Sequence, residues 1–320
     1  MQTIVYVHKG NPFYLRLSIE QARKSNPNAI IILLGDESNS TIKNVKHFYV
    51  KDYFNRAAKF DNIYENYSPN SRNYELFCFQ RWMVIWEFQQ QHPEYNDGFV
   101  YCDSDTLLFD DVIYDLNQLG DSPLALEGIV GPAFTFFNKG TLSNFCDTIE
   151  WFYITKEGKD YISRFIEEKH KRNAIHGFSD MYAFEYYVNN VRKGEAIDAQ
   201  LDCRGGWNRN SQNPLMPLFR YDQNVNFKED FELTKKGIKR FSFKNGKPYA
   251  YSHRWHEDVL FKGIHFQGKA KYEMIKFCNV DIPLLGEYWY QYHIIYSLKK
   301  FKKHIWGIKR FLYIFNKKNQ

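Results

Sequence analysis

The segment most informative about the fold runs Gly98-Phe99-Val100-Tyr101-Cys102-Asp103-Ser104-Asp105-Thr106-Leu107-Leu108-Phe109. An apolar run that stops on two carboxylates and then resumes predicts a buried strand with Asp103 and Asp105 at its carboxyl end. In extended backbone, residues i and i+2 point to the same side, so the two carboxylates are expected to converge. Adjacent anions repel and are costly to bury unpaired, so a cation is the expected partner, and hard oxygen ligands favour Mg²⁺ or Mn²⁺.

Upstream of this segment, the chain alternates apolar strands with a helix. Thr3–Val7 and 29–34 are short apolar runs typical of buried strands, and apolar side chains between them recur at helical spacing. A strand, a helix and a strand in about 35 residues form a βαβ unit, which predicts a parallel sheet with ligands at the carboxyl ends of its strands. His8 follows the first strand and is therefore a candidate for the rim of the site. The usual glycine-rich nucleotide motifs follow neither strand.

The remaining elements are read from periodicity and turn residues. A long helix is predicted over Arg72–Gln91, strand and turn over 128–140, and helical segments over 145–169. A serine is expected to cap a further helix over 179–191, and the Asn-Gly step within 244–248 predicts a hairpin.

The positive charge is concentrated at one end of the sequence. The formal net charge of +6 alone would suggest a nucleic-acid or anionic-membrane partner. Eight of the 43 Lys and Arg residues lie in 288–320, which contains no Asp or Glu, so residues 1–287 carry 35 basic and 37 acidic side chains. Apolar side chains recur in this tail at steps of three and four, a pattern typical of a basic amphipathic helix on a membrane surface. A terminal helix packed on the body is the alternative. We expect a catalytic domain over 1–287 and a tail over 288–320.

Composition also bears on the compartment. No run approaches the roughly 20 apolar residues that cross a bilayer, and the first residues lack the pattern of a signal peptide. The five cysteines are an odd number without a Cys-x-x-Cys pair, which argues against a disulfide framework or a cysteine zinc site. We therefore predict a cytoplasmic protein, peripheral on the cytosolic face of a membrane.

A second chemical motif lies near the end of the catalytic domain: His265-Phe266-Gln267-Gly268-Lys269-Ala270-Lys271. The neutral imidazole of His265 can complete a carboxylate-bound metal site. Gly268 allows the backbone to approach a ligand, and Lys271 supplies a point charge for phosphate.

Together the two motifs resemble those of metal-dependent GT-A glycosyltransferases, and of family 8, the glycogenin and bacterial galactosyltransferase group, most closely. The family's Asp-x-Asp matches Asp103-Ser104-Asp105, and its His-Phe-x-Gly-x-x-Lys matches the second motif at every defined position. The resemblance covers about residues 1–277. It implies an α/β, Rossmann-like nucleotide-diphospho-sugar transferase fold with a mixed, mainly parallel sheet flanked by helices, followed here by the C-terminal basic amphipathic helix.

The resemblance also implies roles for the motif residues. Asp103, Asp105 and His265 would hold Mn²⁺ or Mg²⁺, and Asp103 would also reach the ribose of the donor. Lys271 and the backbone at Gly268 would hold the diphosphate.

Roles outside the two motifs are less sharply defined. His8 and Arg81 are expected to contact the donor, with a surface salt bridge as the alternative for Arg81. Asp180 is the candidate catalytic residue, in contact with the donor sugar or the acceptor, with a solvated helix cap as its alternative. Trp207 and Asn208 are candidate sugar contacts, and Trp207 is as readily a core residue.

The activity that the resemblance implies is transfer of a hexose from a nucleotide-sugar donor, a UDP-sugar, to a glycan or lipid-linked acceptor in surface polysaccharide synthesis. Retention of configuration is implied, whereas inversion would require a base such as Asp180. Tyr272-Glu273 stands where the family has Pro-Trp, and His8-Lys9 stands where it has an acidic residue. These departures leave open which nucleotide base the donor carries and whether the configuration is retained. Two alternatives remain: a nucleotidyltransferase that makes nucleotide sugars, and a non-catalytic nucleic-acid or anionic-polymer binder that uses the tail. For the transferase, no nucleic-acid partner is expected.

Overall fold

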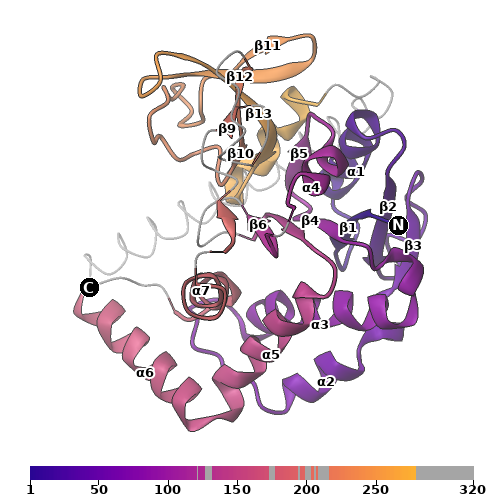
Figure 1. Cartoon of the computed structure of the whole chain (residues 1–320), viewed down its shortest axis with the longest axis vertical. Coiled ribbons are helices and arrows are strands. Elements are labelled where there is room, and N and C mark those ends of the chain that lie inside the picture. The colour runs from indigo at the N-terminus through magenta and orange to yellow at the C-terminus, as the bar shows by residue number, and fades with distance from the viewer. Residues whose placement is uncertain are drawn as a thin grey trace, which may run out of the picture.

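The computed structural model describes residues 1–120, 122–126, 132–172, 177–193, 195–198, 203–204, 207 and 216–278. The tail predicted over 288–320, the domain boundary expected after residue 287, and Asn208 lie outside these residues. The described chain forms two sheets with helices around them (Figure 1).

The central sheet has seven strands in the order β3-β2-β1-β4-β7-β6-β8. In chain order they are β1 (Thr3–Val7), β2 (Ile30–Gly35), β3 (Lys46–Tyr49), β4 (Phe99–Cys102), β6 (Leu124–Leu126), β7 (Phe134–Phe137) and β8 (Ile197–Asp198). Strands β3, β2, β1 and β4 run parallel, and β7 is antiparallel to both β4 and β6. The carboxyl ends of β1, β2 and β4 therefore lie at one edge, where ligands bind in open α/β sheets.

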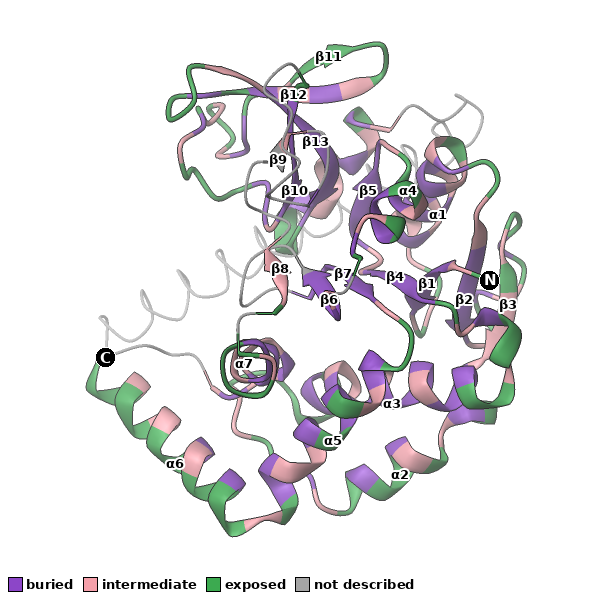
Figure 2. Cartoon of the chain, in the orientation of Figure 1, coloured by how far each residue is buried: buried purple, intermediate pink, exposed green. Residues whose placement is uncertain are grey.

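Helices cover both faces of this sheet because its strands are apolar on both sides. Along β1, Ile4 and Tyr6 pack with α1 and α4 on one face, whereas Val5 and Val7 pack with α3 and α5 on the other. The α-helices are α1 (Phe13–Ser25), α2 (Asn55–Asp61), α3 (Arg72–Gln91), α4 (Val112–Asn117), α5 (Thr141–Ile154), α6 (Lys156–Lys171) and α7 (Asp180–Tyr186). Figure 2 shows buried central strands and a largely exposed outer face on α6. Among the helices in the described ranges, none is both long and apolar enough to cross a membrane.

The second sheet lies beside the first and is built mostly from the later part of the chain. Its strands are β5 (Thr106–Leu108), β9 (Cys203–Arg204), β10 (Leu218–Asp222), β11 (Ser242–Lys244), β12 (Lys247–Ser252) and β13 (Glu257–His265). Strand β13 pairs with β10 on one edge, and with β12 and then β5 on the other. The last three residues of β13 face β5, with His265 opposite Thr106. This register brings the second sequence motif to the first.

The predicted α/β class, with a mainly parallel sheet flanked by helices, is confirmed. The hairpin is also confirmed: Asn245 and Gly246 connect β11 to β12 with φ of 50° and 75°. The helix predicted over 179–191 is α-helical only to Tyr186, after which Tyr187–Val191 (η3) is π-helical. Short 3₁₀ helices complete the fold: η1 (Val50–Tyr53), η2 (Pro93–Tyr95) and η5 (Gly268–Lys276).

Candidate metal and donor site

The two aspartates lie in a tight turn between β4 and β5. The backbone N–H of Asp103 donates to the carbonyl of Ala133, and the carbonyl of Asp105 accepts from the N–H of Phe266. Thr106 closes the turn by donating to the carbonyl of Asp103 through both its N–H and its hydroxyl. The extended backbone expected over 103–105 is therefore wrong, because neighbouring strands of two different sheets hold the two ends of the turn. The expected convergence of the carboxylates is nevertheless present.

Asp103, Asp105 and His265 form a candidate metal site. Each offers one ligand atom, and these three atoms lie within 4.8 Å of one another. Nδ1 of His265 lies 2.6 Å from the carbonyl oxygen of Gln223. Because a carbonyl only accepts, Nδ1 carries the proton and Nε2, which lies 3.5 Å from Asp105 Oδ1, presents its lone pair toward the carboxylates. Two carboxylates and a neutral imidazole fit a divalent cation such as Mn²⁺ or Mg²⁺.

Lys271 also belongs to this cluster. Its Nζ lies 3.1 Å from Asp105 Oδ2 and 4.6 Å from the centre of the Tyr14 ring. Burial raises the pKa of the Asp105 carboxyl, but the contacts with His265 and Lys271 outweigh it and hold this pKa well below its usual range. Asp105 is therefore an anion balanced by Lys271.

Gly268 begins η5, the 3₁₀ helix that returns Lys271 to the site. Its φ is +62°, in the left-handed region, and no atom of the described residues lies within 4 Å of the position that a Cβ would take. The glycine is therefore required by the backbone conformation rather than by crowding. Its predicted approach to a diphosphate stays a prediction.

Arg81 links the turn to α7. Its two terminal nitrogens lie 2.7 Å from Asp103 Oδ1 and 2.6 Å from Asp180 Oδ2. The hydroxyl of Tyr101 accepts from Arg81 at 2.8 Å and donates to Asp103 at 2.5 Å. The side chain of Arg81 is only 11% exposed, so the salt bridge of the alternative is present but is enclosed between two carboxylates rather than lying on the surface. The donor contact stays a prediction.

Asp180 is the first residue of α7 and is 3% exposed. Its Oδ2 accepts from Arg81 and from Nε1 of Trp82 at 3.2 Å. Burial raises the pKa of Asp180, although the charge of Arg81 opposes this. The alternative of a solvated helix cap is therefore wrong, and the side chain of Ser179 makes no capping hydrogen bond. Asp180 is therefore connected to the candidate metal site through the guanidinium of Arg81, which pairs with both Asp180 and Asp103.

His8 follows β1 and lies on the rim, as its position after a strand predicts. Its ring meets Tyr14 edge-on, with the ring centroids 5.9 Å apart. Burial, and then the charge of Lys271, lower the pKa of His8 to about 4, against the effect of Asp103 and Asp105. His8 is therefore a neutral imidazole at neutral pH.

Trp207 is 3% exposed and lies in the hydrophobic core between the two sheets. Its ring meets that of Phe136 edge-on at 4.7 Å and lies 6.2 Å from that of Tyr221. This placement agrees with the core alternative. The sugar contact predicted for Asn208 falls outside the described residues.

Of three comparisons with known proteins, only the one with solved structures finds matches. No family model and no curated protein matches the sequence. Among solved structures, the galactosyltransferase LgtC in complex with donor and acceptor sugar analogues is 16% identical, with a TM-score of 0.34 over 61% of this chain and 72% of its own. The bifunctional glycosyltransferase WbbM is 13% identical, with a TM-score of 0.46, and the match covers 90% of this chain and 51% of WbbM. The glycosyltransferase GlyE of Streptococcus pneumoniae is 14% identical, with a TM-score of 0.37, and the match covers 91% of this chain and 63% of GlyE. The chain is similar to glycosyltransferases.

Sequence reasoning missed several residues that shape the site. Tyr14, Tyr101 and Gln223 hold Lys271, Asp103 and His265 in place. Tyr101 lies in the apolar run before the aspartates, where only the alternation of strand residues could have indicated it.

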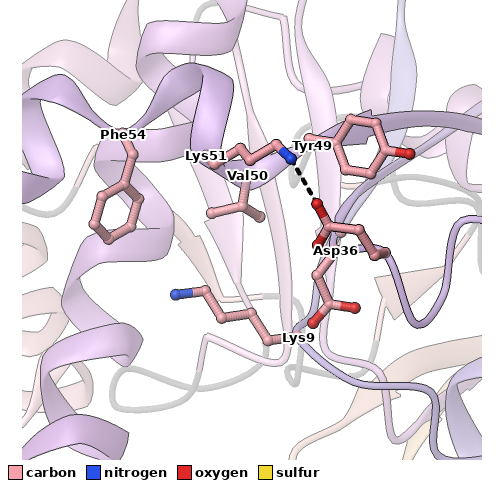
Figure 3. A pocket seen from close by; sticks show the side chains of 8 residues that line it. Lys9, Asp36, Tyr49, Val50, Lys51 and Phe54 are labelled. Carbon is pink, nitrogen blue, oxygen red and sulfur yellow. Dashed lines mark hydrogen bonds and ion pairs between the residues drawn. The ribbon is translucent and has the colours of Figure 1, made fainter.

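A cavity of about 140 Å³ lies at the carboxyl ends of the parallel strands (Figure 3). Lys9 follows β1, Asp36 follows β2, and Tyr49 ends β3, so the rule for open α/β sheets predicts a ligand here. Val50 and Phe54 supply its apolar wall.

Proposed function

We propose that the protein is a metal-dependent glycosyltransferase that moves a hexose from a nucleotide-sugar donor to an acceptor hydroxyl. The observation that carries this proposal is the convergence of Asp103, Asp105, His265 and Lys271 at the carboxyl edge of a parallel sheet. Two carboxylates with an imidazole suit a divalent cation, and the adjacent ammonium suits a diphosphate. Mn²⁺ or Mg²⁺ is the proposed cofactor.

The chemistry breaks the bond between the anomeric carbon and a phosphate oxygen and forms a bond between that carbon and the acceptor hydroxyl oxygen. The nucleoside diphosphate leaves with the electron pair of the broken bond, and the hydroxyl proton passes to the leaving diphosphate or to solvent. A divalent ion held by the three ligand residues would neutralise the charge that develops on this leaving group. Lys271 pairs with Asp105 in the structure. When the donor binds, one or more N–H groups of Lys271 would instead donate hydrogen bonds to the diphosphate. These hydrogen bonds strengthen as the negative charge on the phosphate grows.

We propose that the base of the donor binds in the cavity that Lys9 and Asp36 line. Its Val50 and Phe54 wall suits the face of a base, and Lys9 and Asp36 supply polar contacts. We propose a UDP-sugar, with Asp103 toward the ribose, Gly268 toward the diphosphate, and Asp180 in contact with the donor sugar or the acceptor. Arg81 and Trp82 hold the Asp180 carboxylate in place. The proposed outcome is retention, and the proposed acceptor is a glycan or lipid-linked glycan in surface polysaccharide synthesis.

The first test is a thermal-shift screen of nucleotide sugars with and without Mn²⁺, followed by hydrolysis and transfer assays. We expect Mn²⁺-dependent stabilisation by one class of nucleotide sugar, and loss of both turnover and stabilisation in Asp105→Asn. Asp97→Asn, an exposed carboxylate before β4, is the control and should match the wild type. Turnover that survives in Asp105→Asn after chelation would overturn the proposal. Pyrophosphate release from a nucleoside triphosphate would favour the nucleotidyltransferase instead.

We propose in addition that residues 288–320 bind an anionic membrane surface on the cytosolic side. The supporting observation is their charge of eight Lys and Arg without Asp or Glu, between apolar residues at helical spacing. A chain truncated after Glu287 should no longer co-sediment with vesicles that contain anionic lipid. Unchanged co-sedimentation would contradict this. An anionic-polymer binder would lose affinity on the same truncation and would be indifferent to Asp103→Asn and Asp105→Asn.

A further inference from the structure

The loop after β10 lies directly behind the candidate metal ligand His265. The carbonyl of Gln223 accepts from Nδ1 of His265 at 2.6 Å, and the N–H of Val225 donates to the carbonyl of His265 at 2.9 Å. On the far side of His265, Nδ2 of Asn224 lies 2.6 Å from Oε1 of Gln267. The loop therefore fixes the direction in which the imidazole faces.

A fully buried lysine holds this loop. Nζ of Lys239 lies 2.6 Å from Asp222 Oδ1 and donates to the carbonyl of Asn224 at 2.8 Å. The N–H of Lys239 donates to the carbonyl of Val225 at 2.9 Å. Lys239 thus contacts the residues on both sides of Gln223, and the side chains of Lys239 and Asp222 are both 0% exposed.

Stability alone does not account for this pair. Removing two charges from water is costly, and apolar side chains of similar volume are often at least as stabilising as a buried ion pair. What apolar side chains cannot supply is a donor to the carbonyl of Asn224. Outer contacts of this kind set the tautomer and direction of metal-binding histidines.

We infer that Lys239 is a positioning residue for the metal site: through Asp222 and Asn224 it fixes the Gln223 carbonyl, which orients Nε2 of His265 toward Asp103 and Asp105. The inference rests on the metal site of the proposed function. It assigns the orientation of a proposed metal ligand partly to an ion pair that is not itself among the ligands.

The test compares two double variants of the full chain. Asp222→Leu with Lys239→Met replaces the pair by apolar side chains, which avoids leaving either of the two buried charges alone. Glu229, whose Oε1 lies 3.4 Å from Lys239 Nζ, keeps its ion pair with Arg220. The matched control is Asp115→Leu with Lys262→Met, because Lys262 lies on β13 and pairs with buried Asp115 at 2.7 Å. Mn²⁺ affinity is measured by electron paramagnetic resonance titration, with Asp105→Asn as background, and the His265 tautomer by ¹⁵N NMR without metal. Thermal unfolding shows which variants are folded.

We expect the Asp222/Lys239 variant to bind Mn²⁺ about tenfold or more weakly. We also expect it to lose the single Nδ1–H tautomer of His265. The Asp115/Lys262 variant should change neither. A folded Asp222/Lys239 variant with wild-type Mn²⁺ affinity and tautomer would overturn the inference, as would equal losses in both variants. Absence of Mn²⁺ binding in the wild type would overturn the inference and the proposed metal site together. The expected Mn²⁺ results without glycosyl transfer would support the inference and reject only the proposed function.

Discussion

The guanidinium of Arg81 lies 2.6 Å from the carboxylate of Asp180, although 99 residues separate them in the chain. The same guanidinium holds Asp103 at 2.7 Å, so one side chain of α3 connects the start of α7 to the turn between β4 and β5. Any ligand that changes the position of Asp103 therefore acts on Asp180 through a single group.

Arg81→Met should destabilise the protein strongly. The substitution leaves Asp103 and Asp180 without their shared cation, and removing one partner of a buried pair costs about 3–5 kcal/mol. Urea unfolding measures the loss. Arg56→Met is the control: Arg56 pairs with Asp147, whose side chain is 62% exposed, and with Glu150, so a smaller loss is expected. Equal losses in the two variants would show that the burial of Asp180 is unimportant.

Asp180→Asn should keep the fold and the metal and lose turnover. The amide oxygen can still accept from Arg81 and Trp82, but the negative charge near the donor sugar is gone. If Asp180 contacts the reacting groups, kcat should fall by about 10²–10⁴. Mn²⁺ affinity should change little, because Asp180 is not a ligand. Wild-type kcat in a folded variant would remove Asp180 from the proposed catalytic role.

Lys271→Met should separate donor binding from metal binding. A charge-assisted hydrogen bond is worth about 1.5–3 kcal/mol, so affinity for a nucleoside diphosphate with Mn²⁺ should fall about tenfold to hundredfold. Mn²⁺ alone should bind at least as tightly, because Asp105 loses a competing cation. Calorimetry measures both affinities.

The control for that experiment is Lys276→Met in the same 3₁₀ helix, where the side chain is 57% exposed and pairs with Glu273. It should leave both affinities unchanged. If Lys271→Met weakens Mn²⁺ and nucleotide binding equally, its effect is structural rather than a phosphate contact.

His8→Gln should flatten the dependence of stability on pH. The pKa of His8 is about 4 in the folded chain against 6.5 when unperturbed, so the unfolded chain binds the proton more tightly. Stability therefore rises with pH between these two values and falls as the pH is lowered from 6.5 toward 4. Urea midpoints across this range, with metal chelated, should fall less in His8→Gln than in the wild type. Parallel curves would show that His8 does not titrate in this way.

The elements of the central sheet could be predicted because their signals are local. The predicted helix over Arg72–Gln91 matches α3 residue for residue, and Asp103 follows a strand as expected. The course of the backbone between Asp103 and Asp105 could not be predicted, because it depends on a hydrogen bond donated to Ala133 and one accepted from Phe266, which adjoin strands elsewhere in the chain.

The two sequence motifs named the candidate metal ligands but not what surrounds them. The enclosure of Arg81 and the core placement of Trp207 depend on packing between distant segments. Likewise, a backbone carbonyl such as that of Gln223 has no side-chain signature in the sequence. The sequence motifs therefore predicted which residues could bind the metal, whereas the residues that orient these ligands depend on the tertiary structure.

Strand β13 meets β5 only along its last three residues, and this short pairing brings His265 to Asp105. About 160 residues separate these two ligands, and closing so long a loop is entropically costly and slow relative to local pairing. A nascent chain that has not yet delivered β13 carries the Asp-x-Asp turn without its imidazole. Under the proposed function, a polypeptide that lacks β13 would lack one of the three metal ligands and could not carry out metal-dependent transfer.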